Sequence, residues 1–353
     1  MGGWQNAGDA YSLLNSGPGA WGHLTGLGGD DPVGSALGFG ADVLGWGQAF
    51  GQGAATALGA TKFAAAAATP VINAGLLVLM GMSNMSGLGT PDQGQDFGSG
   101  ADAFGAVGDD LGSTGAPGSW AGDGADTYTG QNELQRGRAT SMAQLDSTVN
   151  DVLKREAQQV TDTRRMIDRC ATGLTLAIPA AIAAKAVPGY GEALSLSIQA
   201  AAVALALPPA EARLAMMAEQ SARNATLIRR TGAGYDRIGT EAQPVAASGG
   251  NEVSVTPADL QHVSTKQEQV VANIGSANQT TDGTSWNVAF SHGLMCAPTN
   301  VAVVGAVASR SAAARTMAAK STELARKLDT VAAIYVITDQ HQQGRVDGQM
   351  HPR

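Results

Sequence analysis

The segment 142–174, MAQLDSTVNDVLKREAQQVTDTRRMIDRCATGL, decides the fold class of this chain. Its apolar residues recur at helical spacings, whereas Arg, Gln, Asp and Glu occupy the other positions. This period predicts an amphipathic α-helix of about 40 residues, roughly 60 Å long. We expect Pro179 to end or kink this helix. The apolar stripe consists of Met142, Leu145, Val149, Val152, Val160, Ile167, Cys170 and Leu174.

A second helical stretch follows the first. An apolar zone covers 174–207 and closes at Pro208-Pro209, after which an amphipathic stripe runs to Ile238. Two long helices joined through an apolar turn region predict a helical hairpin.

A smaller helical unit is expected in the last third of the chain. Thr256 can cap a helix, because Pro257 and Asp259 follow at the first and third helical positions. A polar loop is expected at 279–298, and the final helix carries an apolar seam that ends at Tyr335.

The fold class predicted from these patterns is all-α, because no series of residues alternates as strands do. We expect an elongated helical hairpin or bundle domain, a smaller C-terminal two-helix hairpin and a Gly-rich, poorly ordered N-terminus. The expected divisions are a Gly-rich, loosely ordered segment at 1–40, a helical domain at 41–240, a linker at 241–254, a helical hairpin at 255–340 and a polar tail at 341–353.

Composition and charge argue against two properties, nucleic-acid binding and a Sec-type signal peptide. The net charge is −8, and the stretch up to Glu133 holds twelve acidic residues and one cation, Lys62. An acidic first third repels phosphate and the later Arg residues are dispersed, so we expect no nucleic-acid binding. The first ten residues contain no Lys or Arg and no apolar core, which argues against a Sec-type signal peptide.

No catalytic or cofactor motif is evident in the sequence. The His residues show no metal-ligand spacing with one another or with Cys, and neither a GxSxG elbow nor a phosphate-binding GxxxxGK[ST] loop occurs. We therefore predict no enzyme, no metal site and no cofactor. Cys170 and Cys296 can form one disulfide, stay as two free thiols or pair between molecules.

The uncharged run 63–82 is long enough to cross a hydrocarbon core. However, Pro70 and Asn73 interrupt it, and its five consecutive Ala are weakly apolar. Both a buried helix pair and contact with a membrane remain open for this run and for the apolar zone 174–207.

Two short motifs stand at informative places. Tyr335 and Asp339 are spaced i, i+4 near the end of the last seam helix, so they share one helix face. Trp120 and Gly122 form a WxG sequence in a Gly-rich turn before the longest helix, where a Trp can cover the end of a helical hairpin.

WxG in a turn and YxxxD after a helix together resemble the signature of type VII (ESX) secretion substrates of mycobacterial type. The segment 76–132, with LLVLMGMS, TPDQGQDF and SWAGDGADTYTGQN, is similar to the N-terminal domain of the EspA and EspE proteins. In its pattern WxGxAAxxYxxxN, Gly124 replaces the first Ala, and the matching positions are Gly122, Ala125, Tyr128 and Asn132.

The last part of the chain is similar to EspC. Within 255–340 and the residue before it, SVTPADL, HGLMC and LARKLDTVAAIYVITD follow in the expected order. The turn of this EspC-like hairpin has His292-Gly293 in place of WxG. Trp120 and Tyr335 therefore belong to different predicted domains, and the sequence does not decide whether they meet.

The resemblance implies a non-enzymatic protein exported through an ESX system, with Tyr335 and Asp339 as the secretion signal. It implies the ESX secretion ATPase or a chaperone, and other Esp or WxG-type helical proteins, as partners, with self-association into a homo-oligomer also open. The expected location is outside the cell or at the cell surface or envelope. The alternative is a membrane- or envelope-associated structural protein that inserts its apolar helices.

Overall fold

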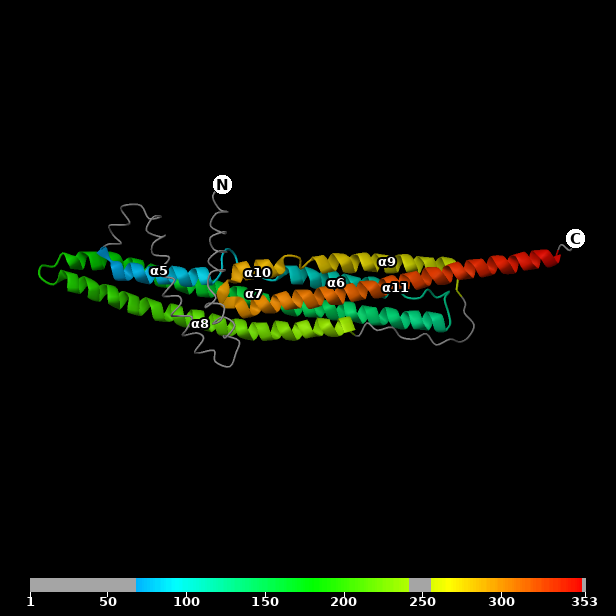
Figure 1. Cartoon of the computed structure of the whole chain (residues 1–353), viewed down its shortest axis with the longest axis horizontal. Coiled ribbons are helices and arrows are strands. Elements are labelled where there is room, and N and C mark those ends of the chain that lie inside the picture. The colour runs from blue at the N-terminus through cyan, green and yellow to red at the C-terminus, as the bar shows by residue number, and fades with distance from the viewer. Residues whose placement is uncertain (1–67, 241–254, 351–353) are drawn as a thin grey trace, which may run out of the picture. The chain divides into compact units, whose positions relative to one another are not determined.

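The computed structural model describes residues 68–240 and 255–350, with side chains up to residue 346 (Figure 1). These ranges are helical and contain no strand, which confirms the all-α fold class. The predicted Gly-rich segment 1–40 and the start of the apolar run, 63–67, lie outside them. The helices are α5 (Pro70–Met85), α6 (Gln95–Ser113), α7 (Asp123–Lys185), α8 (Gly191–Thr240), α9 (Pro257–Gln279), α10 (Thr284–His292), the 3₁₀-helix η1 (Leu294–Cys296) and α11 (Ala297–Met350).

The chain divides into two compact units, and each takes residues from before and after 241–254. The long helices α7, α8 and α11 contribute one part to each unit. The consecutive domain boundaries expected from the sequence stay a prediction. Within the described residues, unit 1 comprises 68–92, 155–225 and 287–300, and unit 2 comprises 93–154, 226–240, 255–286 and 301–350.

In unit 1, α5 packs against the parts of α7 and α8 that belong to this unit (Figure 1). The helix begins at Pro70, and the next amide, of Val71, donates to the side-chain oxygen of Gln199 on α8 at 3.1 Å. Gly75 allows close packing, because a Cβ there would lie 3.0 Å from Val203 and 3.1 Å from Leu174. The buried core consists of Ile72, Leu79, Met82, Met85, Val160, Ile167, Leu174, Ala181, Ala206, Ala210, Leu214, Met217, Met295 and Cys296.

Unit 2 is organised around a fully buried ion pair. Arg310 on α11 contacts both carboxylate oxygens of Asp146 on α7, with Nε–Oδ1 and Nη2–Oδ2 distances of 2.8 Å. Tyr235 on α8 donates to Asp146 at 2.6 Å, and the guanidinium lies 5.0 Å from the centre of the Phe104 ring on α6. Arg310 also donates to the carbonyl of Ala277 in the last turns of α9 at 2.8 Å. One satisfied polar group thus connects five helices of this unit.

The prolines expected to break helices lie inside them. α7 continues through Pro179 to Lys185, and α8 continues through Pro208 and Pro209. A proline removes the hydrogen bond to the carbonyl four residues earlier. At all three positions that carbonyl and the proline itself belong to exposed residues, so water can satisfy the freed acceptor. Residues on the opposite side, such as Leu174 and Ala206, pack into the unit 1 core and hold the helix together.

The polar loop expected at 279–298 is instead mostly helical. It contains α10 and η1, and α11 begins at Ala297. A nine-residue helix with mixed polar and apolar residues has too few turns for its periodicity to be evident in the sequence.

The apolar zones are buried in part. α5 places Ile72, Leu79 and Met82 in the core of unit 1. In the zone 174–207, by contrast, Leu176 is 75% exposed and Leu205 is 79% exposed. By length and composition alone, α7 and α8 each contain a stretch apolar enough to cross a membrane, and 22% of each stretch is buried within the structure.

Candidate functional site

The WxG turn lies immediately before α7 in unit 2. The amide of Trp120 donates to the carbonyl of Pro117 at 2.8 Å, and the carbonyl of Gly122 accepts from the amide of Ala125 at 2.9 Å. Gly122 has φ +104°, a backbone conformation that residues with a Cβ rarely adopt. The glycine therefore lets the chain turn from the Trp into the first turn of the helix.

The Trp120 side chain is buried in a small hydrophobic cluster, here called the Trp120 cluster. Its ring stands 5.3 Å from the ring of Tyr128, centre to centre, at an angle of 31°. The buried members are Trp120, Ala125, Tyr128, Leu260, Val263, Leu328 and Ala332, from the WxG turn, α7, α9 and α11.

Tyr335 packs against the Trp120 cluster and is half-buried. Trp120 and Tyr335, which the sequence assigned to different domains, therefore contribute to the same cluster. Asp339, one helical turn further on, is exposed to solvent. The two halves of the predicted secretion signal thus differ, since the ring contacts the protein and the carboxylate faces water.

The remaining motif residues of the EspA/EspE-like pattern connect α6, α7 and α9. The Tyr128 hydroxyl donates to the carbonyl of Thr114 at 2.6 Å and accepts from the Gln267 amide at 2.9 Å. Asn132 donates to the carbonyl of Leu111 at 2.6 Å and accepts from the same Gln267 at 3.1 Å. Burial raises the pKa of Tyr128 to about 12, so this hydroxyl stays protonated and keeps its donor role.

The start of α9 is tied to the WxG turn. Thr256 caps the helix as the sequence predicts, because its hydroxyl accepts from the amide of Asp259. The Asp259 carboxylate accepts hydrogen bonds from Thr256 at 2.6 Å and from Ser119, the residue before the Trp, at 2.7 Å. These two bonds lower the pKa of Asp259.

The final part of α11 is exposed on all sides. Every side chain from Val336 to Val346 is exposed, and Figure 1 shows this part of α11 extending past the first residues of α9. Apolar residues occur in this part and just before it, since Ile337 is 54% exposed and Ile334 is 57% exposed. An exposed helix with apolar side chains beside Tyr335 and Asp339 is a surface that a helix-binding partner can recognise.

The cysteines are free thiols in the structure. Cys296 is buried and Cys170 is partly buried, both in unit 1. Burial raises the pKa of each thiol above its usual value.

An open hollow of about 410 Å³ lies between α9 and α11 in unit 2. Its lining residues are Glu268, Val271, Thr322, Ala325, Arg326 and Asp329.

The fold and this site define an all-helical protein with a buried WxG turn beside an exposed C-terminal helix. Two family models match the chain in order: the EspA/EspE family at residues 86–169, and "Excreted virulence factor EspC, type VII ESX diderm" at residues 250–348. An EspC-like protein of Mycolicibacterium smegmatis (strain MKD8) is 34% identical over 103 residues, which cover 29% of this chain and 98% of that protein.

Two longer relatives are EspE and EspA proteins. The ESX-1 secretion-associated protein EspE of Mycolicibacterium smegmatis (strain ATCC 700084 / mc(2)155) is 31% identical over 182 residues, 52% of this chain and 35% of that protein. The ESX-1 secretion-associated protein EspA of Mycobacterium tuberculosis (strain ATCC 25618 / H37Rv) is 27% identical over 158 residues, 45% of this chain and 40% of that protein. The chain therefore spans well under half the length of these two relatives. No solved structure matches it.

The chain belongs to the EspC-like family, and a region that matches the EspA/EspE family precedes its EspC region. This order is the one that the motifs in the sequence predict.

Proposed function

We propose that this protein is a non-enzymatic substrate of a type VII (ESX) secretion system, and that Tyr335 and Asp339 on α11 form its export signal. The observation that carries this proposal is the contact of Tyr335 with the Trp120 cluster next to an exposed Asp339. The names of the relatives support the secretion pathway, because they are ESX-1 secretion-associated proteins.

The geometry suggests how the signal is read. The Trp120 cluster fixes the position of α11 at Tyr335, so the exposed turns that follow have a defined direction when a receptor meets them. The receptor we propose is the ESX secretion ATPase or a chaperone, which binds the Asp339 carboxylate and the apolar side chains of Ile334 and Ile337. The same exposed part of α11 can bind further partners. These are other Esp or WxG-type helical proteins, or a second copy of this chain.

The experiment that tests the proposal compares culture filtrate with cell pellet, in strains with and without a working ESX system. We expect the wild type in the filtrate only when the system works. Tyr335→Ala and Asp339→Ala leave the protein folded and expressed but retain it in the cells, because each removes one half of the signal.

Matched controls separate recognition from general effects of substitution. Asp329→Ala removes an exposed carboxylate from the same helix, and Tyr190→Ala removes a tyrosine that is 65% exposed outside the signal. Both controls reach the filtrate. Normal export of Tyr335→Ala and Asp339→Ala would remove the signal assignment.

The alternative function is structural, in a membrane or the cell envelope. It is favoured by one observation, the exposure of Leu176 and Leu205 in the apolar zone 174–207. In this case the wild type stays with the membrane fraction in every strain, and the Tyr335→Ala substitution does not alter its location.

A further inference from the structure

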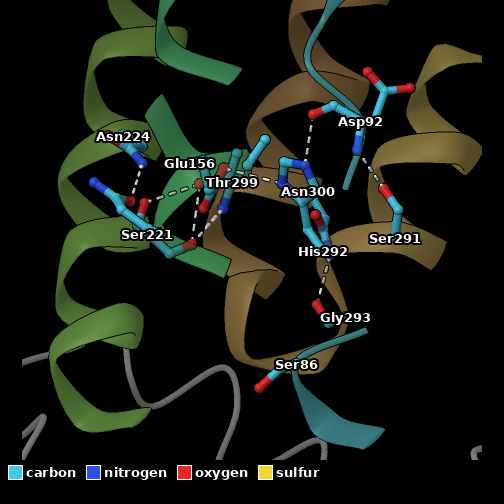
Figure 2. Close-up of polar contacts among 12 residues, drawn as sticks. Ser86, Asp92, Glu156, Ser221, Asn224, Ser291, His292, Gly293, Thr299 and Asn300 are labelled. Atoms are coloured by element: carbon cyan, nitrogen blue, oxygen red, sulfur yellow. Dashed lines mark hydrogen bonds and ion pairs between the residues drawn. The ribbon is translucent and has the colours of Figure 1, made fainter. Parts of the chain in front are cut away.

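Three side chains with metal-binding atoms meet in the interior of unit 1. Glu156 projects from α7, His292 is the last residue of α10, and Cys296 is the last residue of η1. All three side chains are inaccessible to solvent, and their ligand atoms lie within 4.8 Å of one another. Figure 2 shows Glu156 and His292 in this interior, with the hydroxyls of Ser221 and Thr299 beside the carboxylate.

The backbone holds the turn between His292 and Cys296 in place. Gly293 has φ +75°, and a Cβ there would lie 2.1 Å from the backbone nitrogen of Gly87. The Arg164 guanidinium donates to the carbonyl of Ser291 at 2.6 Å. The two ligand-bearing residues of the turn are therefore fixed against α7 by contacts that do not involve their own side chains.

The hydrogen bonds of His292 determine where its proton lies. Its Nε2 is 2.8 Å from the backbone carbonyl of Asp92, and since a carbonyl only accepts, Nε2 carries the hydrogen (Figure 2). A neutral imidazole then has a lone pair on Nδ1. This Nδ1 faces a carboxylate oxygen of Glu156 at 3.5 Å, and within the described residues it has no hydrogen-bond donor.

Glu156 has the same unsatisfied character. Neither of its carboxylate oxygens accepts a hydrogen bond from an N–H or O–H group among the described residues, although both are buried. Its neighbours are the weak thiol donor of Cys296 and the distant His292 ring, and a buried carboxylate without stronger partners destabilises the fold. The lone pair of His292 Nδ1, 3.5 Å from a Glu156 oxygen, repels the carboxylate and destabilises the fold further, unless a positive charge lies between the two groups.

A second proton on the His292 ring would give the Glu156 carboxylate a hydrogen-bond donor, but a poorly placed one. An imidazolium–carboxylate hydrogen bond is normally about 2.7–2.9 Å long, shorter than the 3.5 Å between Nδ1 and the Glu156 oxygen. The other hydrogen-bond partner of this carboxylate is then the thiol of Cys296, which is a weak donor. A metal cation, by contrast, accepts lone pairs from the imidazole, the carboxylate and the sulfur of Cys296 at once.

We propose that Glu156, His292 and Cys296 bind one Zn²⁺ ion in unit 1, through a carboxylate oxygen, Nδ1 and Sγ. Nitrogen, sulfur and carboxylate ligands are those zinc uses, with bond lengths of about 2.0–2.3 Å. Tetrahedral angles then place ligand atoms about 3.3–3.8 Å apart, so small side-chain rotations close the present spread of up to 4.8 Å.

Two features of the surroundings suit zinc. A ligating His commonly donates its other ring N–H to a carbonyl, as His292 does to Asp92. A carboxylate and a thiolate also neutralise Zn²⁺, so the buried site carries no net charge. The fourth coordination position is left to water or to the nearby Ser221 hydroxyl.

Zinc binding displaces the thiol proton of Cys296. This proton is released to solvent, because the thiolate is the form of cysteine that binds the metal. Because the ligands are inaccessible to solvent, we expect zinc to enter as unit 1 folds or opens, and not by simple docking to a surface.

The test uses the full chain without an affinity tag, stripped of metal with a chelator and refolded with or without Zn²⁺. We expect one tightly held zinc per chain and a higher melting temperature with zinc than without it. Refolding with Co²⁺ is expected to give the thiolate-to-cobalt charge-transfer absorption that marks sulfur ligation.

The matched control for Cys296→Ser is Cys170→Ser, because Cys170 lies about 21 Å further along α7 than Glu156. Cys170→Ser retains the zinc and the cobalt absorption. Cys296→Ser and the isosteric Glu156→Gln lose more than the roughly 10- to 100-fold in zinc affinity that second-shell changes cost. Circular dichroism shows whether each variant has folded.

Two results would overturn the proposal. One is wild-type protein that holds no zinc after either treatment, which leaves His292 and Glu156 as an imidazolium–carboxylate pair. The other is folded Cys296→Ser and Glu156→Gln protein that holds zinc as tightly as the wild type.

Discussion

Trp120 and Trp286 allow a direct test of burial at the residue scale, because both lie in unit 2. Trp120 is 9% exposed, whereas Trp286 on α10 is 64% exposed. We expect Trp120→Ala to lower the free energy of unfolding by about 3 kcal/mol, since it removes a buried aromatic ring and leaves a cavity. Trp286→Ala should cost much less. Chemical denaturation followed by circular dichroism measures both, and an unchanged stability of Trp120→Ala would mean that the Trp acts in recognition.

Gly100 and Gly105 provide a second matched pair, on α6. A Cβ at Gly100 would lie 2.4 Å from the Asp146 carboxylate and 2.5 Å from the Arg310 guanidinium, whereas a Cβ at Gly105 meets nothing within 4 Å. We expect Gly100→Ala to cost about 1–3 kcal/mol of stability, because it forces a buried ion pair apart. Gly105→Ala should gain up to about 1 kcal/mol from helix propensity. Equal melting temperatures for the two variants would show that the ion pair does not have this geometry.

At the scale of the helices, the spacing of apolar residues predicts where helices form, and side-chain packing stabilises them. The stripe through Met142 and Val149 gives α7, and the Thr256 cap gives the start of α9, as the sequence predicts. Helix propensity alone gives a wrong prediction at Pro208 and Pro209, through which α8 continues. Packing of one face of α8 in the unit 1 core outweighs the unfavourable propensity of the two prolines.

The contacts that make up the sites could not be predicted from periodicity. Asp146 and Arg310 are 164 residues apart, and a helical pattern gives no sign that a polar residue will be buried opposite another. His292 and Cys296 stand in a turn that was expected to be a polar loop, and their proximity to Glu156 depends on how the turn packs on α7. The contact of Tyr335 with the Trp120 cluster could not be predicted for the same reason.

At the scale of the whole molecule, the EspA/EspE region and the EspC region fold together. In unit 2, Gln267 of the EspC region satisfies Tyr128 and Asn132 of the EspA/EspE region. In unit 1, the hydroxyls of Ser221 and Thr299 are 3.0 Å apart, and Thr299 lies in the EspC region. Each unit therefore takes buried polar contacts from both sides of 241–254, and neither side completes a unit alone.

This shared construction predicts that the covalent connection is dispensable once the chain has folded. We expect a protease site inserted into 241–254 to be cleaved while the two parts remain associated in size-exclusion chromatography. Their association depends on the buried pair, because removing one partner leaves an uncompensated charge that costs about 3–5 kcal/mol. Asp146→Ala should therefore weaken the association after cleavage, whereas Asp329→Ala, which removes an exposed carboxylate, should not. Separation of the wild-type parts on cleavage would mean that the two regions fold as independent, consecutive domains.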